Sequence, residues 1–68
     1  MEIKRGTIRG FDSGTYKATV QIEGSPSYLS GVPVNRGIAS GALVVGQSCA
    51  ILFFDANHPD DAMVLGIY

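Results

Sequence analysis

Residues 48–68 read SCAILFFDANHPDDAMVLGIY, and the rest of the predicted fold is built around this C-terminal stretch. Two apolar runs, residues 49–54 and 62–68, flank a polar insert of residues 55–61 that contains Asp, Asn and Pro. These residue types favour turns over a continued strand, because their side chains bond nearby backbone groups or fix the backbone angle φ. The stretch therefore predicts a β-hairpin.

Both faces of this hairpin are apolar. Alternate side chains of the first run are Cys49, Ile51 and Phe53 on one side and Ala50, Leu52 and Phe54 on the other. One face can line the core of a small domain, but such a domain has little material to cover the second face. We therefore expect the second face to be an interface between copies of the chain. The candidate interface residues are Phe53, Met63, Leu65, Ile67 and Tyr68, and the alternation leaves open which set faces the core.

The composition fits a single small domain, residues 1–68, that depends on association. A chain this short buries only about 60% of the surface that its unfolded form exposes. The single cysteine, Cys49, excludes an internal disulfide, so association is the expected source of extra stability. The net charge of −1 gives no general attraction to nucleic acid or to anionic membranes. Residues 1–36 carry five basic and three acidic side chains, whereas residues 37–68 carry three aspartates, so the molecule is dipolar.

Three more strands are predicted upstream of the hairpin. Residues 3–11 form the first, with a bulge near Gly6 or Gly10, and residues 16–22 form the second, in which apolar and polar side chains alternate cleanly. Residues 28–34 form the third. Because Pro33 cannot donate to a ladder, we expect this strand at a sheet edge or paired with the Pro33 nitrogen facing outward.

The connection between the third strand and the hairpin, residues 35–47, is expected to be a loop or one helical turn. It provides an alternative cover for the second hairpin face, which would make a partner unnecessary.

This pattern predicts an all-β fold, a small five-stranded closed barrel of the oligonucleotide/oligosaccharide-binding (OB) kind, with an SH3-like barrel as the alternative. The uncharged residues 37–54 are broken by glycine and polar side chains and do not predict a membrane span. No secretory signal is visible at the N-terminus. We therefore expect a protein that is cytoplasmic when made and has no membrane partner.

No catalytic or metal site is expected. His58 and Cys49 are the only residues of their types, too few for a zinc site, and we interpret each as an ordinary turn or core residue. The acidic turn of residues 55–61 lacks the glycine and the glutamate of a calcium loop, so we interpret it as a set of turn formers. The glycines form no phosphate-binding motif. The sequence thus predicts no enzyme and no cofactor.

Two other binding functions are alternatives to assembly. Small barrels bind single-stranded nucleic acid by stacking bases on aromatic side chains in a basic groove, although we do not expect this to be the main function. The residues for this alternative are Arg9, Phe11, Lys17, Tyr28 and Arg36. The second alternative is a peptide-binding module, in which a peptide strand adds to the edge at residues 32–34.

The end of the sequence resembles the barrel domain of phage baseplate hub and spike proteins and of the related tip proteins of contractile secretion systems. Residues 49–54, 55–61 and 63–68 are similar to that family's apolar strand, polar turn and closing strand. The motif G-x-I-x-x-F-D at residues 6–12, the alternating residues 16–22 and the pair Val45-Gly46 also resemble it.

The resemblance implies a non-catalytic structural component of a phage or prophage tail or baseplate. It implies a symmetric homo-oligomer, commonly a trimer, with a place in the virion and other virion proteins as partners. Members of the family usually continue into a spike, and the sequence ends at Tyr68. A ring, plug or adaptor is therefore the expected role.

Overall fold

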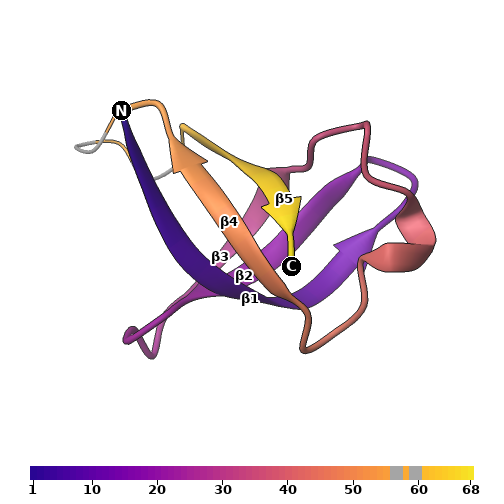
Figure 1. The fold of residues 1–68 in the computed structure, drawn as a ribbon, viewed down its shortest axis with the longest axis horizontal. Helices are drawn as coiled ribbons and strands as arrows, with labels where there is room; N and C mark the ends of the chain where they lie inside the picture. The colour runs from indigo at the N-terminus through magenta and orange to yellow at the C-terminus, as the bar shows by residue number, and fades with distance from the viewer. Residues whose placement is uncertain (56–57, 59–60) are drawn as a thin grey trace.

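The chain folds into five strands and one short 3₁₀ turn. The computed structural model describes residues 1–55, 58 and 61–68. Its elements are β1 (Glu2–Asp12), β2 (Lys17–Ile22), β3 (Tyr28–Pro33), η1 (Ser40–Ala42), β4 (Ser48–Phe53) and β5 (Ala62–Ile67) (Figure 1). The all-β class and the five predicted strands are confirmed. Within the described ranges, no helix is long and apolar enough to span a membrane.

The longest strand, β1, lies in the middle of the antiparallel sheet, whose order is β3-β2-β1-β4-β5. Its first half pairs with β4 and its second half pairs with β2, and Gly6 has a partner on both sides. The register between β1 and β2 shifts between Ile8 and Gly10, which confirms the bulge predicted near Gly10. A bulge bends a strand and increases its twist, so β1 can change direction between the half that pairs with β4 and the half that pairs with β2.

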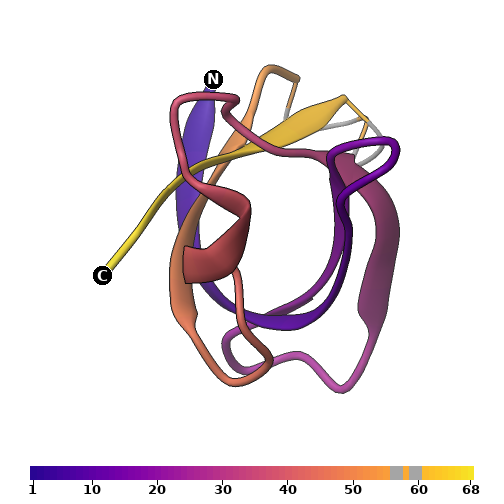
Figure 2. The ribbon, with the colours of Figure 1, turned by 90° about the vertical axis from the view of Figure 1, so that its right-hand side faces the viewer.

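The two edges of the sheet curl towards each other. As Pro33 predicts, β3 is one edge strand, and β5 is the other. The edges approach at an isolated parallel bridge between Val34 and Val64, where the Asn35 N–H donates to the Val64 carbonyl at 2.9 Å. Figure 2 looks along this curl, and the strands trace much of a ring. The fold is therefore a strongly curled, barrel-like sheet.

The core fills the concave side of this sheet. Its buried apolar side chains are Ile8, Ala18, Val20, Val32, Val34, Leu43, Cys49, Ile51, Phe53, Ala62 and Val64. Burial of each large aliphatic side chain contributes about 1.5–3 kcal/mol relative to exposure. The core settles which hairpin face points inward: the face that carries Cys49, Ile51 and Phe53 on β4, and Ala62 and Val64 on β5.

Residues 35–47 cover one end of the curl rather than the outside of the hairpin. Leu43 is buried, Ile38 packs partly against the core, and η1 lies across that end in Figure 2. Tyr16 ties this segment to the turn between β1 and β2, because its hydroxyl donates to the Ile38 carbonyl. The alternation predicts Tyr16 as the first residue of a strand. The strand instead begins at Lys17, because Tyr16 has a φ of 55° that belongs to a turn.

Candidate functional site

An apolar row crosses the outside of three strands. Ile3 on β1 lies opposite Leu52 on β4, and Leu52 lies opposite Met63 on β5. The neighbouring residues on β4 and β5 point into the core, so these three side chains point away from it. Ile3 is 60% exposed, and Leu52 and Met63 are partly exposed. The row is a continuous apolar surface with nothing from this chain on top of it in the described structure.

Two further side chains extend this row along the strands. Phe54 continues the outward alternation of β4 and is 45% exposed. Leu65 sits at a bulge, because Val64 pairs with Ile51 and Gly66 pairs with Ala50, which leaves Leu65 without a partner. A bulge re-aims side chains, and Leu65 is 40% exposed. We call Ile3, Leu52, Phe54, Met63 and Leu65 the apolar outer face.

Only two of the predicted interface residues, Met63 and Leu65, belong to the apolar outer face. The prediction of Phe53 as an interface residue is wrong. Its side chain is 5% exposed, and the Lys4 ammonium lies over its ring, 5.8 Å from the ring centroid. It is a core residue, because the alternation of β4 puts it beside Ile51. Ile67 pairs with Cys49 and packs partly against the core. Tyr68 is exposed beyond the end of β5, where its carbonyl accepts from Gln47 Nε2.

The sequence interpretation missed Ile3, Leu52 and Phe54 as members of this face. The sequence did contain a signal for Ile3. Ile3 and Ile8 are five residues apart, so their side chains point to opposite faces of a regular strand. The bulge that restores the parity of Phe11 lies after Ile8, so it leaves Ile3 on the outside. No local signal existed for Leu52 and Phe54, because both faces of their strand are apolar.

A second surface, on β1, β2 and β3, is basic and polar. The Arg9 guanidinium donates to Gln21 Oε1 from Nε and Nη2, at 3.0 and 2.8 Å. It also lies over the ring of Tyr28, 6.0 Å from the ring centroid. Tyr28 lies opposite Gln21, and Lys17 is further along β2 on the same side. We call Arg9, Lys17, Thr19, Gln21 and Tyr28 the basic outer face.

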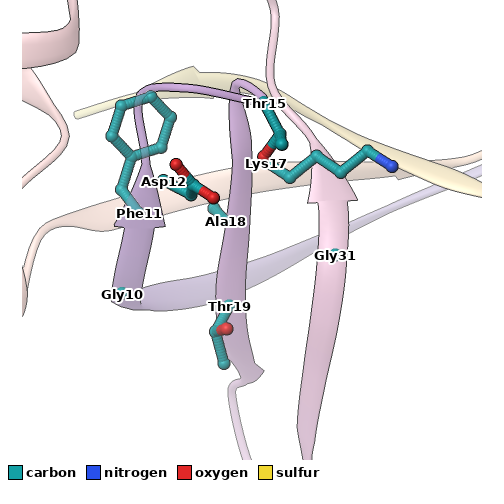
Figure 3. Close-up of a pocket in the computed structure, with 8 residues that line it drawn as sticks. All are labelled: Gly10, Phe11, Asp12, Thr15, Lys17, Ala18, Thr19 and Gly31. Carbon is teal, nitrogen blue, oxygen red and sulfur yellow. The ribbon is translucent and has the colours of Figure 1, made fainter.

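A pocket of about 370 Å³ adjoins this face. Asp12, Thr15 and Lys17 lie at one end of it and Thr19 at the other, as Figure 3 shows. Gly10 and Gly31 line its sides, on the two strands that flank β2. The hollow exists partly because these two glycines have no side chains. It offers hydroxyl groups and one charge of each sign.

The structure separates the residues predicted for nucleic-acid binding into two groups. Arg9, Lys17 and Tyr28 lie on the basic outer face. Phe11 packs edge-to-face on Tyr16, with ring centroids 5.1 Å apart, and also contacts the core. Arg36 lies over the other aromatic ring of that pair, 5.5 Å from the Tyr16 centroid. Arg36 therefore belongs to the covered end of the curl, whereas Phe11 also lines the pocket that adjoins the basic outer face.

The edge predicted to accept a peptide, residues 32–34, is partly occupied. Val32 is buried, and Val34 bridges to β5. The Val34 N–H donates to the Tyr16 carbonyl at 3.1 Å, so it is not available to an added strand.

Cys49 and His58, which the sequence analysis weighed for chemistry, lie in different surroundings: Cys49 is in the core and His58 is exposed. Burial raises the pKa of the Cys49 thiol, which keeps it protonated and weakly nucleophilic. His58 Nε2 lies 3.6 Å from Asp55 Oδ2, and the His58 side chain is largely exposed while that of Asp55 is about half exposed. No group of three or more His, Cys, Asp or Glu side chains among the described residues could hold a metal ion. Asn57 and Asp60 of the acidic turn lie outside the described residues.

Comparisons with models of protein families, with curated proteins and with solved structures found no match to this chain.

Proposed function

We propose that the chain is a non-catalytic structural protein that forms a symmetric homo-oligomer through its apolar outer face. The row of Ile3, Leu52 and Met63 carries this proposal, because an exposed apolar surface that spans three strands marks an interaction site. The segment that the sequence offered as an alternative cover, residues 35–47, packs on the end of the curl instead. A second copy is the partner that the chain itself can supply.

The finer features of the proposal are a closed barrel of the OB kind and a role in a phage or prophage tail or baseplate. The barrel is supported by the approach of β3 and β5 at Val34 and Val64, because an OB fold is a five-stranded, partly open barrel. An SH3-like barrel is the alternative. The phage role rests on the resemblance of residues 49–68 alone, and virion proteins are the partners that it implies.

Three aspartate substitutions test the interface. Leu65→Asp places a charge on the apolar outer face, and we expect a folded species with a lower native mass than the unmodified protein. Val45→Asp is the matched control, because Val45 is also an exposed apolar residue but lies in the loop before β4. It should keep the native mass. Phe53→Asp should not fold, because it buries an unpaired carboxylate in the core.

Native mass by sedimentation velocity and folding by circular dichroism give the readouts. An equal native mass for Leu65→Asp, Val45→Asp and the unmodified protein would overturn the proposal.

Single-stranded nucleic-acid binding is a second candidate, favoured by the cation–π contact of Arg9 with Tyr28 and by Lys17 on the same face. Tyr28 is 56% exposed, so a base could stack on its ring beside Arg9. A fluorescent oligonucleotide should bind at low salt and dissociate as salt rises. Lys17→Ala should weaken this binding, whereas Arg36→Ala, a substitution outside the basic outer face, should not. Absence of binding at tens of micromolar protein would eliminate this candidate.

A further inference from the structure

Two opposite charges lie at opposite corners of the apolar outer face. Arg5 on β1 lies opposite Ala50, two residues beyond the Ile3 and Leu52 row. Asp61 precedes β5 and lies beside Phe54, whose N–H donates to the Asp61 carbonyl at 2.9 Å. Both residues are exposed. One corner is thus basic and on the β1 side, and the other is acidic and on the β5 side.

These two charges are too far apart to pair within one copy. Ala50 and Phe54 are four residues apart on β4, which corresponds to about 13 Å along the strand at a rise of 3.3 Å per residue. Arg5 and Asp61 are also separated by the width of β4, because Arg5 lies on β1, on one side of β4, and Asp61 lies just before β5, on the other side. This separation exceeds the Debye length of about 8 Å at physiological salt. Among the described interactions, neither side chain has an ion-pair partner.

We propose that the apolar outer face pairs with the same face of a second copy about a two-fold axis, so that Arg5 of each copy meets Asp61 of the other. This inference rests on the proposed homo-oligomer and specifies its contact. A two-fold axis brings the same patch of both copies together, so the contact between Arg5 and Asp61 forms twice in each dimer. The second copy is identified by charge complementarity at the two ends of an apolar surface.

The positions of the charges also determine how the strands cross. An axis that exchanges the Arg5 and Asp61 corners runs along the other diagonal of the face, over Leu52. Leu52 therefore meets its own copy, and the Leu65 corner lies near the axis. The strands of the two copies then cross at a steep angle, which is the orthogonal class of sheet packing. Parallel or antiparallel alignment of the strands would leave Arg5 and Asp61 apart.

Charge reversal tests this pairing directly. Arg5→Glu and Asp61→Lys each place two like charges together at both corners, and each should raise the dissociation constant of the dimer about tenfold or more. The double variant Arg5→Glu/Asp61→Lys restores opposite charges and should recover most of the affinity. Lys17→Glu is the matched control for Arg5→Glu, because it makes the same change of charge on the basic outer face and should leave the dissociation constant unchanged.

Sedimentation equilibrium measures the mass and the dissociation constant, and circular dichroism checks that each variant is folded. The expected mass of the unmodified protein is twice the 7.2 kDa of one chain. An unmodified protein that stays monomeric overturns the homo-oligomer and this inference together. An oligomer that tolerates both single reversals, that gains nothing from the double reversal or that has the mass of three chains overturns only the proposed pairing.

Discussion

Gly6→Ala should destabilise the fold, because Gly6 is the point at which β1 pairs with strands on both sides. A Cβ added at Gly6 would lie 2.7 Å from Ile51 Cδ1 and 2.9 Å from the Gln21 carbonyl oxygen. The Ile51 methyl group is the end of a side chain and can move. The Gln21 oxygen belongs to the backbone of β2 and can move only if β2 shifts away from β1.

The expected cost follows from these two contacts. Overpacking a core costs about 1–3 kcal/mol. Alanine also reduces the freedom of the unfolded chain, which offsets about 0.4–1 kcal/mol. We therefore expect a net loss of roughly 1–2 kcal/mol in the free energy of unfolding. For a domain of this size, such a loss lowers Tm by roughly 4–16 °C.

Gly10→Ala on the same strand provides the control. A Cβ at Gly10 would meet only Thr19 Cβ, at an ordinary 3.9 Å, and Gly10 does not have a positive φ. This variant should be as stable as the unmodified protein or more stable by up to about 1 kcal/mol. Chemical denaturation at one fixed protein concentration gives the comparison, since association also shifts apparent stability.

A double-mutant cycle identifies the atom responsible. Ile51→Val removes the Cδ1 atom that the new methyl group approaches, and alone it should cost about 0.5–1.5 kcal/mol. Gly6→Ala/Ile51→Val should then be less destabilised than the sum of the single variants by at least about 0.5 kcal/mol. Simple additivity in the cycle would assign the cost to the Gln21 oxygen instead of Ile51 Cδ1. Equal stability of Gly6→Ala and Gly10→Ala would refute the close packing of β1 against β2 and β4.

Three further predictions concern individual contacts. Tyr16→Phe removes the hydroxyl that donates to the Ile38 carbonyl and should lower the free energy of unfolding by about 0.5–1.5 kcal/mol in urea denaturation. Asn35→Ala removes the side-chain amide that donates to the Leu65 carbonyl. It should speed hydrogen exchange of the backbone N–H at position 35, which donates to the Val64 carbonyl, while exchange in β1 stays unchanged. Burial raises the pKa of the Cys49 thiol, so the unfolded chain loses this proton at lower pH than the folded chain, and stability should fall as pH rises past the ordinary value of 9.0. Cys49→Ala should reduce that fall, and an identical pH dependence in the two proteins would contradict the burial of the thiol.

The strands could be predicted from the sequence because their patterns are local. The alternation of residues 16–22 corresponds to β2 closely, with Ala18 and Val20 buried as expected. Pro33 marks an edge strand because proline has no N–H to donate to a ladder, and glycine inside a strand marks a bulge, which the sequence placed near Gly6 or Gly10. These features depend on a few neighbouring residues and need no knowledge of the rest of the fold.

The candidate site depended on contacts that are distant in the sequence. Both faces of β4 are apolar, and pairing with β1 and β5 determines that Phe53 faces the core while Leu52 faces outward. Ile3 joins Leu52 only because the first half of β1 pairs with β4. The bulge at Leu65 is likewise visible only in the paired strands. The alternation alone gave no means to choose between the two faces of the hairpin.

Light scattering over a wide range of concentrations gives the native mass of the unmodified protein, which distinguishes a single chain from the proposed dimer. We expect a mass of twice the 7.2 kDa chain that persists on dilution until the protein concentration approaches the dissociation constant. A mass of one chain at every concentration would contradict the claim that the apolar outer face of β1, β4 and β5 is covered by a second copy.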